Sequence, residues 1–253
     1  MGVKYIFCIS TGRSGTAYLC KLLGALEKCQ AFHEQKPILH HGIMRSYLAG
    51  KTAPLKHVMP NKVKHIKKHS ESLYVDTSHI FIKSFGWELP KYIPEDEIGV
   101  VILKRDKEQV VESTQRVHSG PFTYTGRKWI ITPYRLAIIK PPLSFLTYMF
   151  YRALFKGYEF VRGERNQIEK TYPKCIVKYS KKLLEWYYDE TYALAEKYKA
   201  QYPNITYITV DLDGLNTIEG VEKIIQTFKL EHLYAKAKIL PYLGQKTNLK
   251  LEY

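Results

Sequence analysis

One short segment near the start of the chain combines the residue types that bind phosphate. Residues 10–17 read Ser-Thr-Gly-Arg-Ser-Gly-Thr-Ala and follow an apolar run that is typical of a buried strand. A strand that runs into a loop of small residues and then a helix points several backbone N–H groups and the helix dipole at one place, which suits a phosphate. The Gly-Lys-Ser/Thr that closes a Walker A loop is absent. We therefore expect this loop to bind a phosphate-like group through Arg13.

A second segment places another arginine at the end of a strand. Ile98–Lys104 is a continuous apolar run, typical of a central parallel strand that is covered on both faces. Arg105 follows directly, and Ser113 lies eight residues later on a helix expected over Lys107–Val117. Ligands of parallel α/β sheets bind at the carboxyl ends of the strands, where both Arg13 and Arg105 fall. We expect the two segments to contribute to one site.

Alternating strand and helix patterns surround these segments. The expected strands are Val3–Ser10, Leu73–Thr77, Ile98–Lys104 and Ile205–Val210. The expected helices are Thr16–Glu27, Pro60–Ser72, Lys107–Val117, Lys181–Gln201 and Thr217–Phe228. This alternation predicts an α/β protein with a three-layer, doubly wound parallel β-sheet flanked by helices, of the P-loop-like nucleotide fold.

Taken together, the two segments resemble the nucleotide-binding elements of the sulfotransferases that use 3′-phosphoadenosine 5′-phosphosulfate (PAPS). In that family a Lys or Arg followed by Ser-Gly-Thr-Thr binds the 5′-phosphosulfate, and a strand-end Arg with a later Ser binds the 3′-phosphate. The matching residues here are Arg13, Ser14, Gly15 and Thr16 in the first segment, and Arg105 and Ser113 in the second. Ala17 replaces the second Thr, so one hydroxyl contact is lost while its backbone N–H remains. The resemblance continues through residues 205–228 and is weakest over residues 119–179.

The resemblance also implies which residues act on the acceptor and the transferred group. Several subfamilies place a catalytic Glu just beyond the first helix, where Glu34 stands here, and His33 is the neighbouring alternative. The other interpretation is a loop of ordinary exposed polar residues. Lys83 corresponds to a lysine beside the transferring sulfuryl group, although a surface lysine fits the pattern equally. Lys246 corresponds to a residue that contacts the 3′-phosphate or the adenine.

These residue types suit sulfuryl transfer for a physical reason. Like phosphoryl transfer, this reaction spreads negative charge over the moving group and the leaving oxygen, so catalysis depends on positioning and electrostatic stabilisation. Arg13 stays protonated and offers a planar fork of donors to such charge. No metal site is expected, because His65 and His69 stand among lysines and indicate a solvated basic face.

Composition favours a single intracellular domain. The chain has 253 residues, 45% of them hydrophobic, which is enough for one α/β core. Its four cysteines show no C-x-x-C spacing, so we expect neither a disulfide framework nor a zinc site. The first strand begins near Val3 and leaves no room for a signal peptide, which favours the cytoplasm. We expect one sulfotransferase-like domain over residues 1–253, with residues 119–179 as an acceptor-binding or lid insertion.

The charge of the chain indicates anionic partners. Thirty-nine Lys and Arg oppose 24 Asp and Glu, giving a formal net charge of +15. This favours nucleotides, acidic lipid headgroups or acidic glycans, and no sequence motif indicates specific nucleic-acid binding. Residues 129–155 are rich in apolar residues but are interrupted by Arg, Lys and Pro, so they do not form a clean membrane span. They fit a lid over the acceptor, an amphipathic segment that touches lipid, or a packed helix.

The expected reaction is transfer of a sulfuryl group from PAPS to a hydroxyl of a carbohydrate, a glycolipid or a small metabolite. Two alternatives come from other classes. A kinase with a variant P-loop would prefer ATP with Mg²⁺ and would leave Arg105 and Ser113 without a role. A non-catalytic basic module would bind polyanions in a salt-dependent manner without a saturable nucleotide site.

Overall fold

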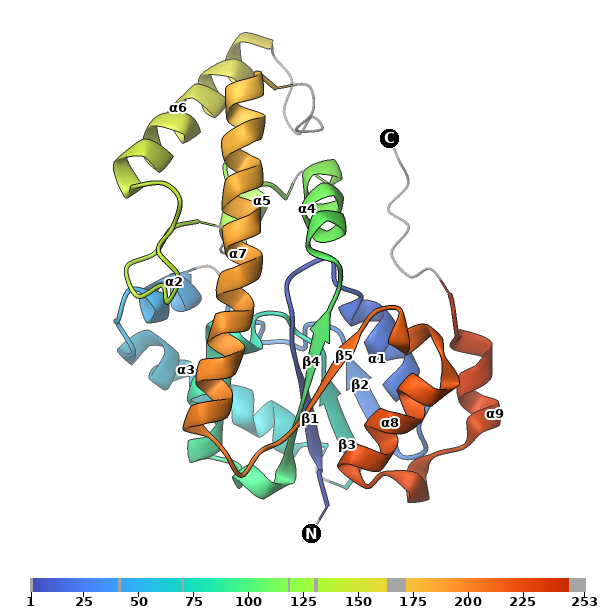
Figure 1. The fold of residues 1–253 in the computed structure, drawn as a ribbon. Helices are drawn as coiled ribbons and strands as arrows, with labels where there is room; N and C mark the ends of the chain where they lie inside the picture. The colour runs from blue at the N-terminus through green and yellow to red at the C-terminus, as the bar shows by residue number, and fades with distance from the viewer. Residues whose placement is uncertain are drawn as a thin grey trace.

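A five-stranded, all-parallel sheet forms the centre of the protein (Figure 1). The computed structural model describes residues 2–40, 42–69, 71–117, 119–129, 132–162 and 172–245. The strands are β1 (Tyr5–Ile9), β2 (Cys29–Phe32), β3 (Leu73–Asp76), β4 (Ile98–Lys104) and β5 (Thr206–Asp211), in the order β2-β3-β1-β4-β5. Because all the strands are parallel, the loops that follow them meet at one edge of the sheet. The predicted parallel α/β sheet is confirmed.

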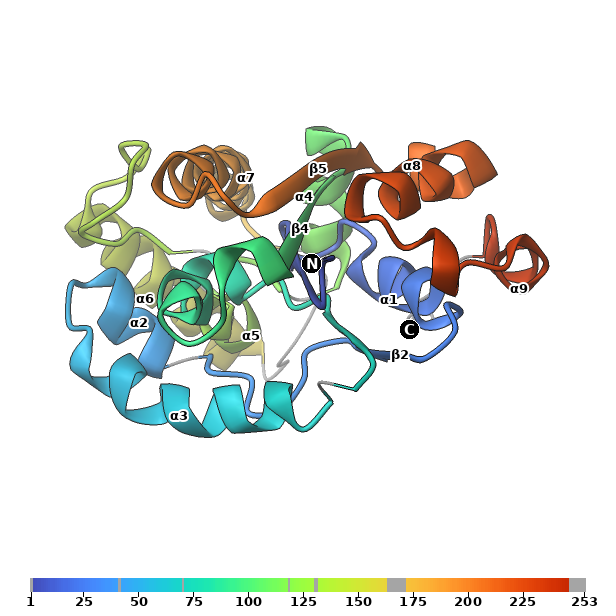
Figure 2. The ribbon, with the colours of Figure 1, turned by 90° about the horizontal axis from the view of Figure 1, so that it is seen from below.

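Helices cover both faces of this sheet and make three layers (Figure 2). One face packs against α1 (Thr16–Gly24), α8 (Ile218–Phe228) and α9 (Lys236–Ile239), and the other against α3 (Ala53–Lys67) and α7 (Lys174–Gln201). Successive side chains of β1 alternate between the two cores: Phe7 and Ile9 point to the α3/α7 side, and Ile6 and Cys8 to the α1/α8 side. Burial on both faces explains why β1 and β4 are apolar throughout.

A third hydrophobic cluster lies beyond the carboxyl ends of the strands (Figure 1). It joins α4 (Lys107–Arg116), α6 (Phe145–Arg162) and the first half of α7, with α5 (Tyr124–Lys128) nearby. The helix α2 (Gly42–Leu48) packs against α3. Short 3-10 turns link β3 to β4 at Phe81–Lys83, Phe85–Trp87, Leu89–Lys91 and Glu95–Glu97. The segment 119–179 thus contributes α5, α6 and the start of α7, while its role as an acceptor lid stays a prediction.

Several boundaries differ from the sequence prediction, most of all at the first helix, α3 and α7. The first helix ends at Gly24 rather than Glu27, and the chain then forms the edge strand β2, which was not predicted. Three of its residues are partly buried, Gln30 is exposed, and no clear alternation is present, so pairing with β3 is what makes them a strand. The helix α3 begins at Ala53 and includes Pro60, which was expected to start it. The helix α7 begins seven residues earlier than Lys181.

Candidate anion-binding and catalytic site

The loop after β1 has the backbone geometry of an anion site. Arg13 and Gly15 both have positive φ angles, of 69° and 94°, and Gly15 caps α1 without a side-chain hydrogen bond. The positive φ of Gly15 favours glycine, and a Cβ there would lie 2.6 Å from Cδ1 of Leu212, so that side chain would have to move. The first N–H groups of α1 have no acceptor within the helix and point out of its start. The loop can therefore direct several donors at one negatively charged group.

Arginines from two segments meet at this loop. The Nε of Arg13 donates to the Ser113 hydroxyl at 3.1 Å, and Nη1 of Arg105 donates to the backbone oxygen of Arg13 at 3.0 Å. Burial, together with the charges of Arg105 and Arg116, lowers the pKa of Arg13 from its usual value. No arginine forms an ion pair with a carboxylate in the part of the chain that the structure describes. This cluster of guanidinium groups suits a ligand that carries several negative charges.

A carboxylate and an imidazole form a pair close to the same loop. Glu34 follows β2, His79 follows β3, and Oε1 of Glu34 lies 3.2 Å from Nδ1 of His79. The imidazole is nearly buried and stacks at a tilt on Trp129 with ring centroids 4.9 Å apart. Its Nε2 faces the loop after β1 and lies 4.0 Å from the position that a Cβ on Gly12 would take. Glu34 therefore holds one nitrogen of the His79 ring, and the other nitrogen is directed at the loop.

Burial and the neighbouring charged groups both shift the pKa values of this pair. For Glu34, burial opposes ionisation, but the hydrogen bond and charge of His79, with His33 and His40, hold its pKa below the usual value. For His79, burial dominates, and the charge of Lys83 adds to it, so the pKa falls despite the bond to Glu34. A neutral imidazole beside an ionised carboxylate follows near neutral pH. Such an imidazole can donate Nδ1–H to Glu34 and accept a proton at Nε2.

Lys83 is a buried lysine at the same centre. Its side chain is 2% exposed, so the interpretation as a surface lysine is wrong. The Nζ donates to the hydroxyl of Tyr187 and to the backbone oxygen of Trp129 at 3.4 Å. The same Tyr187 oxygen accepts the N–H of Gly12 at 3.3 Å. Burial lowers the pKa of Lys83 to about 7, against the opposing charge of Glu34.

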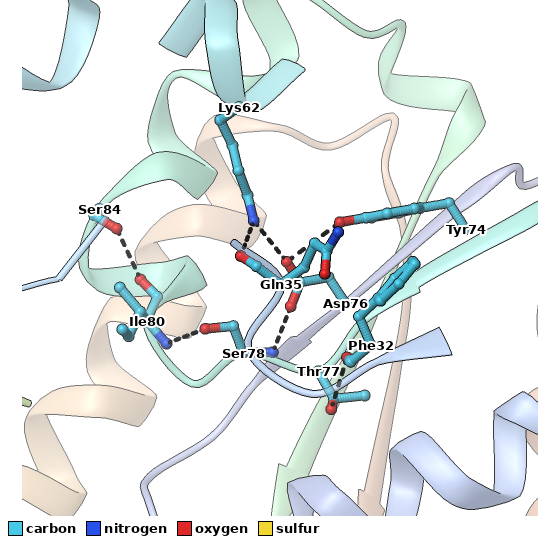
Figure 3. A network of polar contacts seen from close by, with 9 residues as sticks. All are labelled: Phe32, Gln35, Lys62, Tyr74, Asp76, Thr77, Ser78, Ile80 and Ser84. Atoms are coloured by element: carbon cyan, nitrogen blue, oxygen red, sulfur yellow. Dashed lines mark hydrogen bonds and ion pairs between the residues drawn. The ribbon is translucent and has the colours of Figure 1, made fainter. Parts of the chain in front are cut away.

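A buried ion pair fixes the segments that carry Glu34 and His79 (Figure 3). The Nζ of Lys62 lies 2.9 Å from Oδ2 of Asp76, and both side chains are completely buried. The same ammonium donates to the backbone oxygen of Gln35 at 2.8 Å. The other Asp76 oxygen accepts the N–H of Ser78 at 3.1 Å. One pair thus joins the residue after Glu34 to the residue before His79.

The other residues singled out from the sequence do not belong to the Glu34–His79 pair. His33 is exposed, and its Nε2 lies 3.0 Å from the hydroxyl of Thr16, so it contacts the loop without joining the Glu34–His79 pair. Ala17 lies in the first turn of α1, and Lys246 lies outside the described residues. Of the two histidines on the basic face, His65 is exposed and His69 packs on the ring of Phe32 at 5.1 Å.

Sequence reasoning missed two residues of this centre. His79 lies three positions after β3, at the carboxyl edge of the sheet, where ligands of parallel α/β sheets bind. Its position just after a predicted strand could therefore have identified it as a candidate site residue. Tyr187 lies in the middle of α7, in a Tyr-rich helix where no local pattern distinguishes it from packing tyrosines.

Two comparisons with known proteins found no relative of this chain. A scan against models of known protein families finds no match, and a search of curated proteins finds none either.

Proposed function

We propose that this protein is a PAPS-dependent sulfotransferase. The observation that carries the proposal is the convergence of Arg13, Arg105 and Ser113, which come from two segments about ninety residues apart and meet within hydrogen-bond distance. A nucleotide with phosphate at both its 3′ and 5′ positions needs two anion contacts of this kind. Arginine satisfies such contacts with charge-assisted bonds that do not depend on pH.

The donor nucleotide would be bound at both ends. The N–H groups of residues 14–17, the Thr16 hydroxyl and Arg13 would receive the 5′-phosphosulfate, and Arg105 with Ser113 would receive the 3′-phosphate. On binding, Arg13 exchanges its bond to Ser113 for bonds to phosphate oxygens. This supplies positive charge where the leaving phosphate gains negative charge. Lys83, linked to the loop through Tyr187 and Gly12, adds a donor on the acceptor side.

The acceptor hydroxyl loses its proton to the Glu34–His79 pair. Glu34 was expected to be the base by itself, but a carboxylate with a lowered pKa is a weak proton acceptor. His79 has the better geometry, because its Nε2 faces the loop while Glu34 holds Nδ1. Glu34 then stabilises the imidazolium that forms. The acceptor class remains a hydroxyl of a carbohydrate, a glycolipid or a small metabolite, and the proposed location is the cytoplasm.

Nucleotide binding tests the donor assignment. Thermal shift should show stabilisation by adenosine 3′,5′-bisphosphate and little by ATP with Mg²⁺. Arg105→Ala should weaken bisphosphate binding by about ten- to a hundredfold, because a hydrogen bond to a charged group contributes roughly 1.5–3 kcal/mol. Arg135→Ala, at an exposed arginine in a different region, is the matched control and should bind normally. Stronger stabilisation by ATP with Mg²⁺ would favour the kinase alternative instead.

Turnover with PAPS and pooled hydroxyl acceptors, followed by the mass of the added sulfate, tests the reaction. Arg13→Ala should abolish transfer. Glu34→Gln and His79→Asn should each lower turnover while nucleotide affinity stays nearly unchanged. If His33→Ala alone has that effect, the proton acceptor has been assigned to the wrong residue.

A further inference from the structure

The outward side of α6 is covered by large apolar side chains. Leu146, Phe160 and Val161 are 80%, 88% and 84% exposed. The apolar face, as we define it, consists of Leu146, Met149, Phe150, Leu154, Phe160 and Val161. Elsewhere in the described chain, large apolar side chains are exposed only at Tyr124, Leu240 and Tyr242 and at four positions just before this face, between residues 136 and 145. Such a concentration marks an interaction surface.

This face is not needed to hold α6 on the protein. The opposite side of the helix buries Tyr148, Phe155 and Glu159, and Phe155 stacks on Tyr172 with ring centroids 4.6 Å apart. At helical spacing, residues 146, 150, 153, 157 and 161 lie directly opposite those buried positions. No charged residue stands among them, and Arg152 and Lys156 lie on the flank. The helix is therefore packed on one side and apolar on the side that faces water.

An open apolar groove adjoins this face. It lies between α6 and the first turns of α7, has a volume of about 560 Å³, and includes Phe150, Leu154, Val161 and Ile176 in its lining. Its lining is almost entirely apolar, which suits hydrocarbon rather than a polar ligand.

The charge around the apolar face is strongly positive. The described residues 132–162 and 172–182 contain nine Lys and Arg against one Glu, so this sixth of the chain has a net charge of +8 out of +15. Lys156, Lys174 and Lys178 are exposed. Glu159 is buried against Tyr172 and paired with Lys156, so it does not offset this charge at the surface. An occupant of this surface should be apolar at its centre and anionic around it.

We propose that the apolar face of α6 docks on an anionic phospholipid bilayer. A helix with an apolar face and basic flanks lies in the headgroup region, with its apolar side chains inserted and its cations on acidic lipids. None of the helices in the described residues is long and apolar enough to cross a membrane, so α6 would lie on the surface. A second copy of the chain is the poorer occupant, because a two-fold contact would bring two regions of +8 together. This proposal does not depend on the sulfotransferase assignment.

Vesicle co-sedimentation of the purified 253-residue protein tests the proposal. We expect binding to vesicles of phosphatidylcholine with one third phosphatidylserine, weaker binding to pure phosphatidylcholine, and a loss of binding as salt increases. The double variant Leu146→Glu/Phe160→Glu should lower the partition onto anionic vesicles by about tenfold or more. Both positions are almost fully exposed, so the fold should be kept, and circular dichroism with thermal unfolding checks this.

Leu240→Glu/Tyr242→Glu is the matched control, because it also adds two negative charges, at exposed large side chains outside the apolar face. It should bind vesicles like the unchanged protein. Equal binding by the double variant, or no sedimentation with anionic vesicles, overturns the proposal. A concentration-dependent dimer that the double variant abolishes, without vesicle binding, assigns the face to a second copy and also overturns it.

Discussion

Lys83→Met should change how the stability of the protein depends on pH. Lys83 is a fully buried ammonium whose pKa burial lowers from 10.5 to about 7. Methionine has a similar length and flexibility but no charge, so it keeps much of the packing. The substitution lowers the free energy of unfolding because it removes the hydrogen bonds from Nζ to Tyr187 and to the Trp129 oxygen. This loss does not depend on pH in this range. The difference between the two proteins across pH therefore isolates the ionisation of Lys83.

The magnitude follows from the two pKa values. Between pH 7 and 10.5 the unfolded chain holds the Lys83 proton more tightly than the folded protein, so the free energy of unfolding rises with pH in this window. This contribution is fully present above the unfolded pKa and is lost as pH falls towards the folded pKa. Relative to the variant, the unchanged protein should gain about 2 kcal/mol from pH 7 to pH 9.

Urea unfolding followed by tryptophan fluorescence at pH 7, 8 and 9 measures this difference. Lys178→Met, at an exposed lysine of α7, is the control and should alter the free energy of unfolding by less than about 0.5 kcal/mol at each pH. A difference between the unchanged protein and Lys83→Met that stays constant from pH 7 to pH 9 would refute the reasoning. It would mean that the folded protein accommodates the ammonium as well as water does.

Three further experiments test other parts of the structure. Lys62→Met should destabilise by about 3–5 kcal/mol in urea unfolding, because it leaves Asp76 as an unpaired buried charge, and adding Asp76→Leu should recover much of that loss. Gly15→Ala should weaken binding of adenosine 3′,5′-bisphosphate in a thermal-shift titration, whereas Gly157→Ala, in open space on α6, should stabilise by about 0.5–1 kcal/mol. Glu190→Gln should lower the unfolding free energy by roughly 1–3 kcal/mol, since the buried carboxylate accepts two backbone N–H groups and a tyrosine hydroxyl; an unchanged midpoint would contradict this.

Much of the scaffold could be predicted from local sequence. The strand Ile98–Lys104 was predicted with the bounds that it has, because an unbroken apolar run fits only a strand buried on both faces. Parallel strands end at one edge, so Arg13 and Arg105 could be placed near each other without coordinates. The edge strand β2 could not be predicted in this way, because its four residues, none of them fully buried, become a strand only through their pairing with β3.

What the sequence by itself determined was the parallel α/β sheet and the loop that carries Arg13, since apolar runs and small-residue loops express their structure locally. Only the tertiary structure decided which polar side chains are buried and which partners they have. The local sequence around a lysine does not show whether its side chain is solvated or buried. Lys62 and Lys83 are buried because Asp76 and Tyr187 supply their hydrogen-bond partners. Tyr187 lies 104 residues from Lys83, and Glu34 meets His79 only where the ends of β2 and β3 come together. Contacts of that kind depend on how helices and strands pack, which no local pattern encodes.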